Sequence, residues 1–246
     1  MAHVLGIDIG GSGMKAAPVD TDTGELLTER QKLETPRPAT PDAMVPVVAD
    51  LVKSCGWSGK AGITFPGVVH SGVIRTAANL DPSWIGTDGV KVFGKATGLD
   101  VTILNDADAA GVAEMKFGAG KDERGTVLML TLGTGIGSAL FIDGILVPNT
   151  EFGHIELHGK DAEKRASEHA REAEDLHWGA WAERVDEYLR HMEALLSPDL
   201  IIIGGGVSRK SEKFLPKLTG LQARIVPAAL QNDAGIVGAA MAAVGA

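Results

Sequence analysis

Apolar residues occur along this chain in short runs that glycines interrupt, and the runs predict alternating strands and helices. Residues 3–9 are β-branched and apolar, as in a buried strand. Residues 10–13 are a tight glycine turn, residues 14–19 resume as a second strand, and a third strand is expected to begin at Gly24. Because a strand rather than a helix follows the glycines, this turn is not a dinucleotide-binding fingerprint.

The pattern of apolar positions also predicts the remaining elements. Helices are expected where apolar residues share one face, over residues 42–54, 90–97, 107–117, 161–174, 178–196, from about 207, and 234–244. Strands are expected where short apolar runs meet turn residues, over 62–65, 72–76, 101–104, 126–132, 138–142, 200–203 and 223–226. Strand, glycine turn and strand occur twice, near 4–19 and 126–142, which predicts two similar α/β lobes.

Composition narrows the class of protein. With 246 residues, 44% apolar and 22% charged, the chain has the balance of a soluble globular protein. No apolar run approaches the roughly 20 residues of a membrane span, and no secretory signal is visible, so a cytoplasmic location without membrane partners is expected. Cys55 is the only cysteine, which excludes an internal disulfide and a multi-cysteine zinc site. A net charge of −9 argues against nucleic acid as a partner, although amides and a few lysines can still bind a polyanion locally.

Three glycine clusters follow predicted strands. Glycine lets successive backbone amides point into one concavity, and such nests bind phosphate. Any one cluster is equally an ordinary turn, whereas three at strand ends favour a phosphate site. The clusters and their neighbouring hydroxyls are Gly10, Gly11, Ser12 and Gly13; Thr131, Gly133, Thr134 and Gly135; and Gly204, Gly205 and Gly206.

Several charged and amide side chains lie beside these predicted strand ends. Asp8 interrupts an apolar strand two residues before the first turn, where it either approaches Mg²⁺ or accepts amides of the turn. Lys15 either offsets phosphate charge or is solvated. Asn105 and Asp106 end a buried strand, the place where α/β sheets bind ligands, but both types are also common helix caps.

The segment from Glu151 to His158 is unusually polar. If it is extended, His154, Glu156 and His158 share a face and a metal site is conceivable. The favoured interpretation is that carboxylate and imidazole groups bind a hydroxyl-rich ligand, which needs acceptors and a switchable donor.

Basic residues follow the third glycine cluster. They either line a polyanion track or form a solvated helix face. These residues are Arg209, Lys210, Lys213 and Lys217.

Four motifs, taken together and in this order, resemble the ROK sugar kinases over nearly the whole chain. They span residues 8–15, 104–111, 131–137 and 151–154. The resemblance implies an α/β, two-lobed, actin-like ATPase (ribonuclease H-like) fold with a cleft between the lobes, and phosphorylation of a sugar hydroxyl. We expect a smaller lobe of residues 1–105 plus 234–246 and a larger lobe of residues 106–233.

The same resemblance implies roles for individual residues. Asp106 would be the catalytic base, and Asp8 would lie near Mg²⁺, directly or through water. The sugar would be bound by Asn105, Asp106, Glu151, His154 and Glu163, with Gly67 and Asn79 in loops on the sugar side. The phosphoryl donor would be bound by Gly10, Gly11, Ser12, Gly13, Lys15, Thr131, Gly133, Thr134, Gly135, Gly204 and Gly205.

One departure from the family pattern is informative. Many members carry a zinc site of one histidine and three cysteines, but no cysteine follows His154, so no structural zinc is expected. Residues 65–68, 153–167 and 232–240 resemble the polyphosphate glucokinase branch. Its members transfer phosphate from inorganic polyphosphate, often also from ATP, to the 6-hydroxyl of glucose, and some accept mannose.

Other functions are weighed against this one. The alternative is a strictly ATP-dependent ROK hexose kinase, in which Gly204–Gly206 would contact the adenosine side. With polyphosphate, Arg209 and Lys210 would matter more. ROK transcriptional regulators carry an N-terminal helix-turn-helix, for which no room precedes residue 3, and the sugar-type Glu151 and His154 disfavour an actin-like filament. The resemblance suggests a homodimer. The apolar face of residues 178–196 either contributes to the contact between subunits or packs in the core.

Overall fold

The computed structural model describes residues 3–245, which form two compact units. Unit 1 joins the chain up to Ala113 with the chain from Asp233 onward, and unit 2 is Glu114–Asn232. The division therefore falls inside α3 (Asp106–Phe117), whereas the expected lobe boundary preceded that helix.

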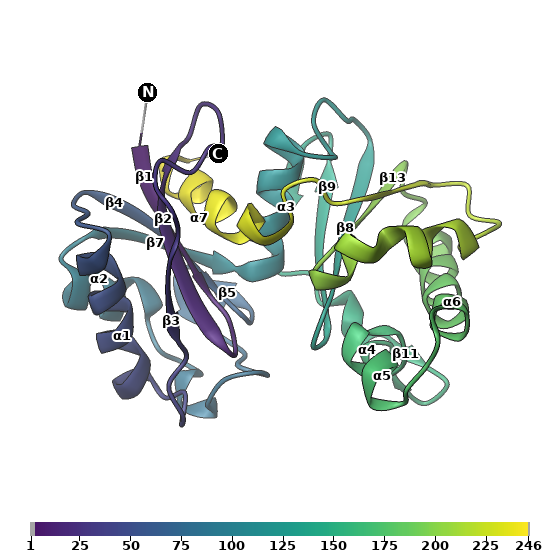
Figure 1. The fold of residues 1–246 in the computed structure, drawn as a ribbon, viewed down its shortest axis with the longest axis horizontal. Coiled ribbons are helices and arrows are strands. Elements are labelled where there is room, and N and C mark those ends of the chain that lie inside the picture. Colours follow the sequence, from purple (N-terminus) through teal and green to yellow (C-terminus); the bar gives the residue numbers. More distant parts are fainter. Residues whose placement is uncertain (1–2, 246) are drawn as a thin grey trace. The chain divides into compact units, whose positions relative to one another are not determined.

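Unit 1 is built on a five-stranded sheet in the order β3-β2-β1-β4-β7. Its strands are β1 (His3–Ile9), β2 (Gly13–Asp20), β3 (Gln31–Glu34), β4 (Lys60–Phe65) and β7 (Asp100–Asn105). β1 is antiparallel to β2 and parallel to β4, and β4 is parallel to β7. Helices α1 (Pro41–Ser54) and α2 (Gly89–Thr97) lie on one face and α7 (Ala234–Val244) on the other, as Figure 1 shows.

Local signals explain where the helices of unit 1 begin and end. The Thr40 hydroxyl accepts the N–H of Ala43 at the start of α1, and the Asp88 carboxylate accepts an N–H in the first turn of α2. α2 ends at Gly98, whose left-handed φ of 72° suits glycine. A short 3-10 turn (Pro82–Trp84) and the hairpin of β5 (Val69–His70) and β6 (Val73–Ile74) complete the unit.

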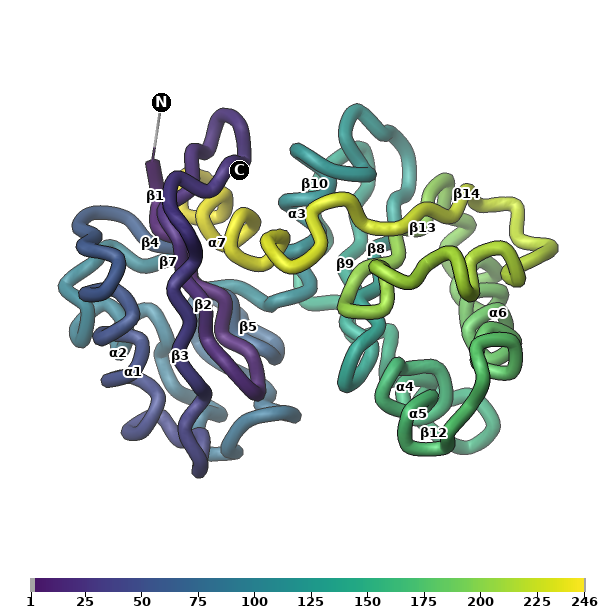
Figure 2. Tube along the Cα trace, in the orientation of Figure 1, coloured from purple at the N-terminus to yellow at the C-terminus, as the bar shows by residue number. Residues whose placement is uncertain are grey.

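Helix α7 packs on the sheet through glycines of the strands. A Cβ at Gly62 would overlap the carbonyl of Ala239, and one at Gly6 would overlap that of Ile236. The helix is buried on nearly every side, as its uniformly small and apolar sequence predicts. Figure 2 traces this segment, in yellow, to its place beside the purple strand β1.

Unit 2 repeats the sheet of unit 1, in the order β10-β9-β8-β13-β14. Its strands are β8 (Thr126–Leu132), β9 (Ile136–Ile142), β10 (Ile145–Val147), β13 (Leu200–Gly204) and β14 (Arg224–Pro227). β8 is again antiparallel to one neighbour, β9, and parallel to the other, β13, which is parallel to β14.

The remaining elements of unit 2 are helices, short turns and one small hairpin. The helices are α4 (Glu163–Ala166), α5 (Glu168–Ala173) and α6 (Trp178–Leu196), and the hairpin is β11 (Glu156–Leu157) with β12 (Lys160–Asp161). Short 3-10 helices cover Phe152–His154, η3 (Gly206–Lys213), η4 (Leu215–Lys217) and Gln231–Asp233.

The apolar face of α6 lies in the core of unit 2. Trp181, Tyr188 and Met192 are fully buried, in one cluster with Leu128 and Ile201 of the sheet. Of the two alternatives for residues 178–196, packing in the core is confirmed for these side chains, whereas Leu195 is 60% exposed. Among residues 3–245, no helix has the length and apolar character needed to cross a membrane.

Three sequence predictions differ from the structure. The third strand begins at Gln31 rather than Gly24, where the chain forms only a bridge between Leu26 and Val19. The helix expected over 161–174 is broken at Ser167, whose extended backbone ends α4 and whose hydroxyl caps α5. The helix expected from 207 is a 3-10 segment with a kink at Lys210, because the Ser208 hydroxyl bonds the Gly205 carbonyl and Pro216 follows closely.

Candidate functional site

The glycine turn of unit 1, between β1 and β2, is held by its carbonyl oxygens. The Thr35 hydroxyl donates to the Gly10 carbonyl at 2.6 Å, and the Arg37 guanidinium donates to the Gly11 carbonyl at 2.8 Å. In a trans peptide the N–H points away from the C=O of the same peptide group. These bonds therefore turn the N–H groups of Gly11 and Ser12 to the opposite side, as an anion nest requires.

Asp8 lies two residues before this glycine turn, and two side chains hold its carboxylate. The Thr64 hydroxyl donates to Oδ1 at 2.9 Å, and the Lys15 ammonium lies 3.6 Å from Oδ2. Lys15 is thus paired with Asp8 rather than simply solvated. The Asp8 side chain is still 21% exposed. A single carboxylate that remains accessible fits Mg²⁺, which prefers one or two carboxylates together with waters and substrate phosphates.

Asn105 and Asp106 stand where β7 ends and α3 begins. The Asn105 Oδ1 accepts the N–H groups of Ala107 at 2.8 Å and Asp108 at 3.0 Å, so the capping interpretation of Asn105 is confirmed. Asp106 follows in the first turn, where its half-buried carboxylate accepts the N–H of Ala107 at 2.9 Å.

The two loop residues assigned to the sugar side lie in different places. The Gly67 carbonyl accepts the Asn105 Nδ2–H at 3.1 Å, and Gly67 itself lies so close to Thr76 that a Cβ would overlap its carbonyl. Asn79 is exposed and lies beside the glycine turn, where a Cβ at Gly11 would be 3.6 Å from its carbonyl oxygen. Within unit 1, Gly67 therefore joins Asn105, whereas Asn79 joins the phosphate-type turn.

The glycine turn of unit 2, between β8 and β9, carries a carboxylate. The Gly133 carbonyl accepts the N–H of His169 from α5 at 3.0 Å. The Glu163 Oε2 accepts the N–H of Ile136 at 3.3 Å and lies 2.3 Å from the position of a Cβ at Gly135. Glu163, from α4, is therefore placed directly against the turn by contacts distant in sequence.

Three further groups gather around Glu163. The His154 Nδ1 lies 3.3 Å from Asp161, and its Nε2 lies 3.6 Å from Glu151. Ligand-type atoms of His154, Asp161 and Glu163 lie within 4.8 Å of one another, so this cluster could hold a cation or several hydroxyls. Burial raises the pKa of the Glu151 carboxyl, His154 lowers that pKa, and the nearby Glu163 charge raises it.

The structure brings Glu151, His154 and Glu163 together. The alternative metal site, formed by His154, Glu156 and His158 on one face of an extended segment, is wrong. Residues around His154 form a 3-10 turn, and His158 instead bonds Glu187 at 2.5 Å. Reasoning from sequence missed Asp161 and Thr64. Thr64 had a usable signal, since it interrupts an apolar strand just as Asp8 does, whereas Asp161 is inconspicuous in a charged stretch.

The third glycine cluster meets the second at the end of β8. Gly205 has a φ of 83°, and a Cβ there would stand 2.5 Å from the Leu132 carbonyl oxygen. Gly204 lies beside the Thr131 methyl, and Gly206 lies beside the Glu168 carboxylate. Two of the three clusters are thus adjacent within unit 2, close to the start of α5.

Known proteins with this architecture were found by sequence and by structure. A polyphosphate glucokinase from Mycobacterium tuberculosis (strain CDC 1551 / Oshkosh) is 54% identical over 243 residues, covering 98% of this chain and 91% of that protein. An inorganic polyphosphate/ATP-glucomannokinase from Arthrobacter sp. strain KM aligns with a TM-score of 0.96 at 47% identity, over 99% of both chains. A ROK family glucokinase from Streptomyces griseus, solved with glucose and AMPPNP, aligns over 100% of both chains with a TM-score of 0.83 at 26% identity.

These likenesses confirm the expected actin-like fold with two α/β sheets. The model of the ROK family matches residues 4–172, which is more than half of the sequence. Together with the relatives above, this match shows that the chain belongs to the ROK family.

Proposed function

We propose that this chain is a glucokinase that transfers a phosphoryl group from inorganic polyphosphate, and also from ATP, to the 6-hydroxyl of glucose. One observation carries the proposal: the Glu163 carboxylate touches the glycine turn of unit 2 and also lies in the cluster with His154. Groups suited to sugar hydroxyls are therefore next to amides suited to phosphate. The names of the mycobacterial and Arthrobacter relatives support polyphosphate, ATP and glucose as the substrates.

The donor phosphates bind to backbone amides of the glycine turns. In unit 1 the restrained carbonyls leave the Gly11 and Ser12 amides for the donor, with Lys15 offsetting charge. In unit 2 the Gly133 and Gly205 segments supply the corresponding backbone. The full donor set is Gly10, Gly11, Ser12, Gly13, Lys15, Thr131, Gly133, Thr134, Gly135, Gly204 and Gly205.

The sugar hydroxyls bind to carboxylates, one imidazole and amide groups. Carboxylates accept hydrogen bonds from two hydroxyls at once, and an imidazole both donates and accepts, so such a set distinguishes a hexose from water. The proposed sugar set is Gly67, Asn79, Asn105, Asp106, Glu151, His154 and Glu163, of which Asn79 lies beside the glycine turn of unit 1.

Asp106 acts as the general base. Its carboxylate takes the proton of the glucose 6-hydroxyl as the new O–P bond forms and the bond to the rest of the donor breaks. The products are glucose 6-phosphate and a polyphosphate shorter by one unit, or ADP. Positioning of the hydroxyl in line with the phosphorus supplies most of the acceleration, because phosphoryl transfer needs little covalent help from protein.

Asp8 is the residue that would hold Mg²⁺. The ion, when bound, offsets negative charge on the donor phosphates. The Thr64 hydroxyl and the Lys15 ammonium hold the Asp8 carboxylate in place.

The direct test is formation of glucose 6-phosphate by the purified chain with each donor. We expect turnover with polyphosphate and also with ATP, and none with either donor when glucose is omitted. Turnover with ATP alone would replace the proposal by a strictly ATP-dependent hexose kinase. Failure with both donors would remove glucokinase activity altogether.

A further inference from the structure

We infer that a basic patch around Trp178 in unit 2 binds the part of a polyphosphate chain that extends beyond the transferred end. The inference rests on the proposed function and adds a subsite to it. The patch, called the Trp178 patch below, consists of Arg171, Trp178, Lys210, Lys213 and Lys217.

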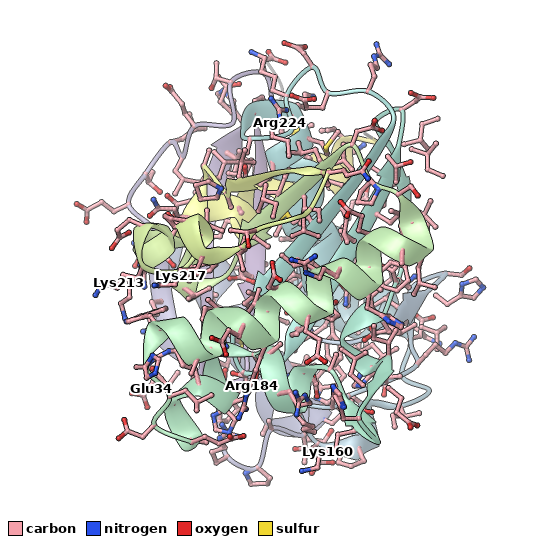
Figure 3. All side chains as sticks on the ribbon, turned by 90° about the vertical axis from the view of Figure 1, so that its right-hand side faces the viewer. Glu34, Lys160, Arg184, Lys213, Lys217 and Arg224 are labelled. Carbon is pink, nitrogen blue, oxygen red and sulfur yellow. The ribbon has the colours of Figure 1, made fainter. Side chains whose placement is uncertain are left out.

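Three cations of the Trp178 patch converge on one indole ring. The Arg171 guanidinium carbon lies 4.5 Å from the ring centre, and the ammonium groups of Lys210 and Lys213 lie 5.8 and 5.6 Å from it. The Lys217 ammonium reaches the first turn of α6, 4.0 Å from the position of a Cβ at Gly179. Figure 3 shows Lys213 and Lys217 next to each other in that view.

In the part of the chain that the structure describes, the lysines of the Trp178 patch lack the acidic partners that several arginines of unit 2 have. Within residues 3–245, no ion pair is formed by Lys210, Lys213 or Lys217, nor by the neighbouring Arg209. By contrast, ion pairs occupy several basic residues elsewhere in unit 2, at Arg165, Arg184, Arg190 and Arg224.

Of the basic residues in the Trp178 patch, Arg171 alone has an acidic partner within residues 3–245. Glu172 pairs with Arg171 at 3.1 Å, Glu212 is exposed on the same 3-10 segment as the lysines, and Glu168 faces Gly206. The Arg171 Nε is a buried donor without an acceptor in the described chain. Like charges held this close repel one another, and the indole face offsets only part of that cost. A bound polyanion would remove the repulsion.

The Trp178 patch is connected to the donor turns through two short elements. η3 starts at Gly206 in the third glycine cluster and carries Lys210 and Lys213. α5 contributes the His169 N–H that holds the Gly133 carbonyl, and Arg171 follows two residues later. At the usual 3-10 rise, Lys210 lies about 8 Å along the segment from Gly206, which is farther than a single phosphate extends.

The chemistry of the Trp178 patch suits repeated phosphates better than a nucleoside. An adenine base stacks on an open aromatic face, but the Trp178 ring already packs with Phe214 and Trp181 and lies under cations. Separate ammonium groups can each contact a successive phosphate without recognising any other feature.

The test compares donors of different length in a double variant, Lys210→Gln with Lys213→Gln. For long-chain polyphosphate we expect kcat/KM to fall roughly tenfold, because two charge contacts are lost. The fall should be much smaller with tripolyphosphate or ATP, which are too short to reach both lysines. The matched control is Lys91→Gln with Lys95→Gln, which removes two exposed charges on α2 of unit 1 and should leave every donor unaffected.

Equal losses with all three donors would overturn the inference, since the lysines would then serve the common donor site. No loss with long chains would also overturn it and leave a solvated surface. Direct binding gives a second measurement: long-chain polyphosphate should quench tryptophan fluorescence, and the quench should vanish in Trp178→Phe and weaken in the double variant. If the wild type binds in this way but phosphorylates no glucose, the proposed function fails while the Trp178 patch stands.

Discussion

The two units share one strand order and one set of strand directions, yet they restrain their glycine turns differently. In unit 1 the turn carbonyls are held by Thr35 and Arg37, side chains at and beyond the edge strand β3. In unit 2 the turn is held by Glu163 and by the α5 backbone at His169. The shared sheet therefore fixes where a turn is placed, and the connecting segments decide which chemical groups surround it.

The connections after the second parallel strand differ most. Unit 1 places a regular helix, α2, between β4 and β7, and its two lysines are simply exposed. Unit 2 places the 3-10 segments η3 and η4 between β13 and β14, and these carry the lysines of the Trp178 patch. A less regular connection thus gathers lysines around one indole ring in unit 2, whereas the two lysines of α2 are exposed on a regular helix.

The largest effect is expected from a substitution in unit 1 of Asp106, the residue that we propose as the base. Asp106→Asn is expected to lower kcat about a thousandfold, because the amide cannot take the hydroxyl proton. The variant should fold, since an amide oxygen can still accept the Ala107 N–H that Asp106 now accepts. Steady-state kinetics and glucose binding by calorimetry measure the two effects separately.

The matched control is Asp100→Asn, which removes an exposed carboxylate at the other end of β7. It should leave kcat unchanged. Near-normal turnover in Asp106→Asn would contradict the assignment of the base.

Two glycine substitutions, one in each unit, should differ in their effect on stability because only one of the two glycines is closely packed. Gly62→Ala forces a methyl into the carbonyl of Ala239 and should destabilise unit 1 by about 3 kcal/mol, because neither backbone can yield cheaply. Gly133→Ala meets nothing within 4 Å and should change stability by less than about 1 kcal/mol. Denaturant unfolding of the two variants compares them, and equal losses would show that α7 does not pack as described.

The smallest expected effect is a pH dependence of stability that arises from one carboxyl group in unit 2. Burial raises the pKa of Glu151, so the folded state binds this proton more tightly than the unfolded state does. Stability is therefore lost as the pH rises from the ordinary glutamate range through the raised pKa. Glu151→Gln should be more stable than the wild type at neutral pH, by less than about 1 kcal/mol because the side chain is 38% exposed.

Thermal unfolding at neutral and at acidic pH would measure this difference. The advantage of Glu151→Gln should disappear below the ordinary pKa of a glutamate. An advantage that is the same at both pH values would mean that the Glu151 charge is not responsible.

Local sequence patterns were sufficient for much of the fold. The buried strand β13 is uniformly apolar, β1 is apolar apart from His3 and Asp8, and the wholly apolar α7 was expected to be buried. β3 could not be placed because all four of its residues are exposed, so it has no alternation of apolar and polar positions. Apolar spacing did not predict the kinked 3-10 form of η3, because it does not report side chain-to-backbone bonds such as the one from the Ser208 hydroxyl.

The candidate site was predictable where one strand carries the signal. Asp8 and the Gly10 turn stand out against apolar neighbours, and Asn105 has the position of a helix cap. Glu163 came only from the family resemblance, because its contact with Ile136 spans 27 residues of chain. Asp161 was missed because its partner, His154, is brought to it by a turn that the spacing did not predict.

Helix α7 also imposes an order on biosynthesis. The ribosome releases the strands of unit 1 first, then all of unit 2, and only then the helix that covers β1 and β4. Until that moment the apolar face of the first sheet lacks its cover, while the second sheet already has its own. The packing of the first sheet is therefore completed only after α7 has been synthesised.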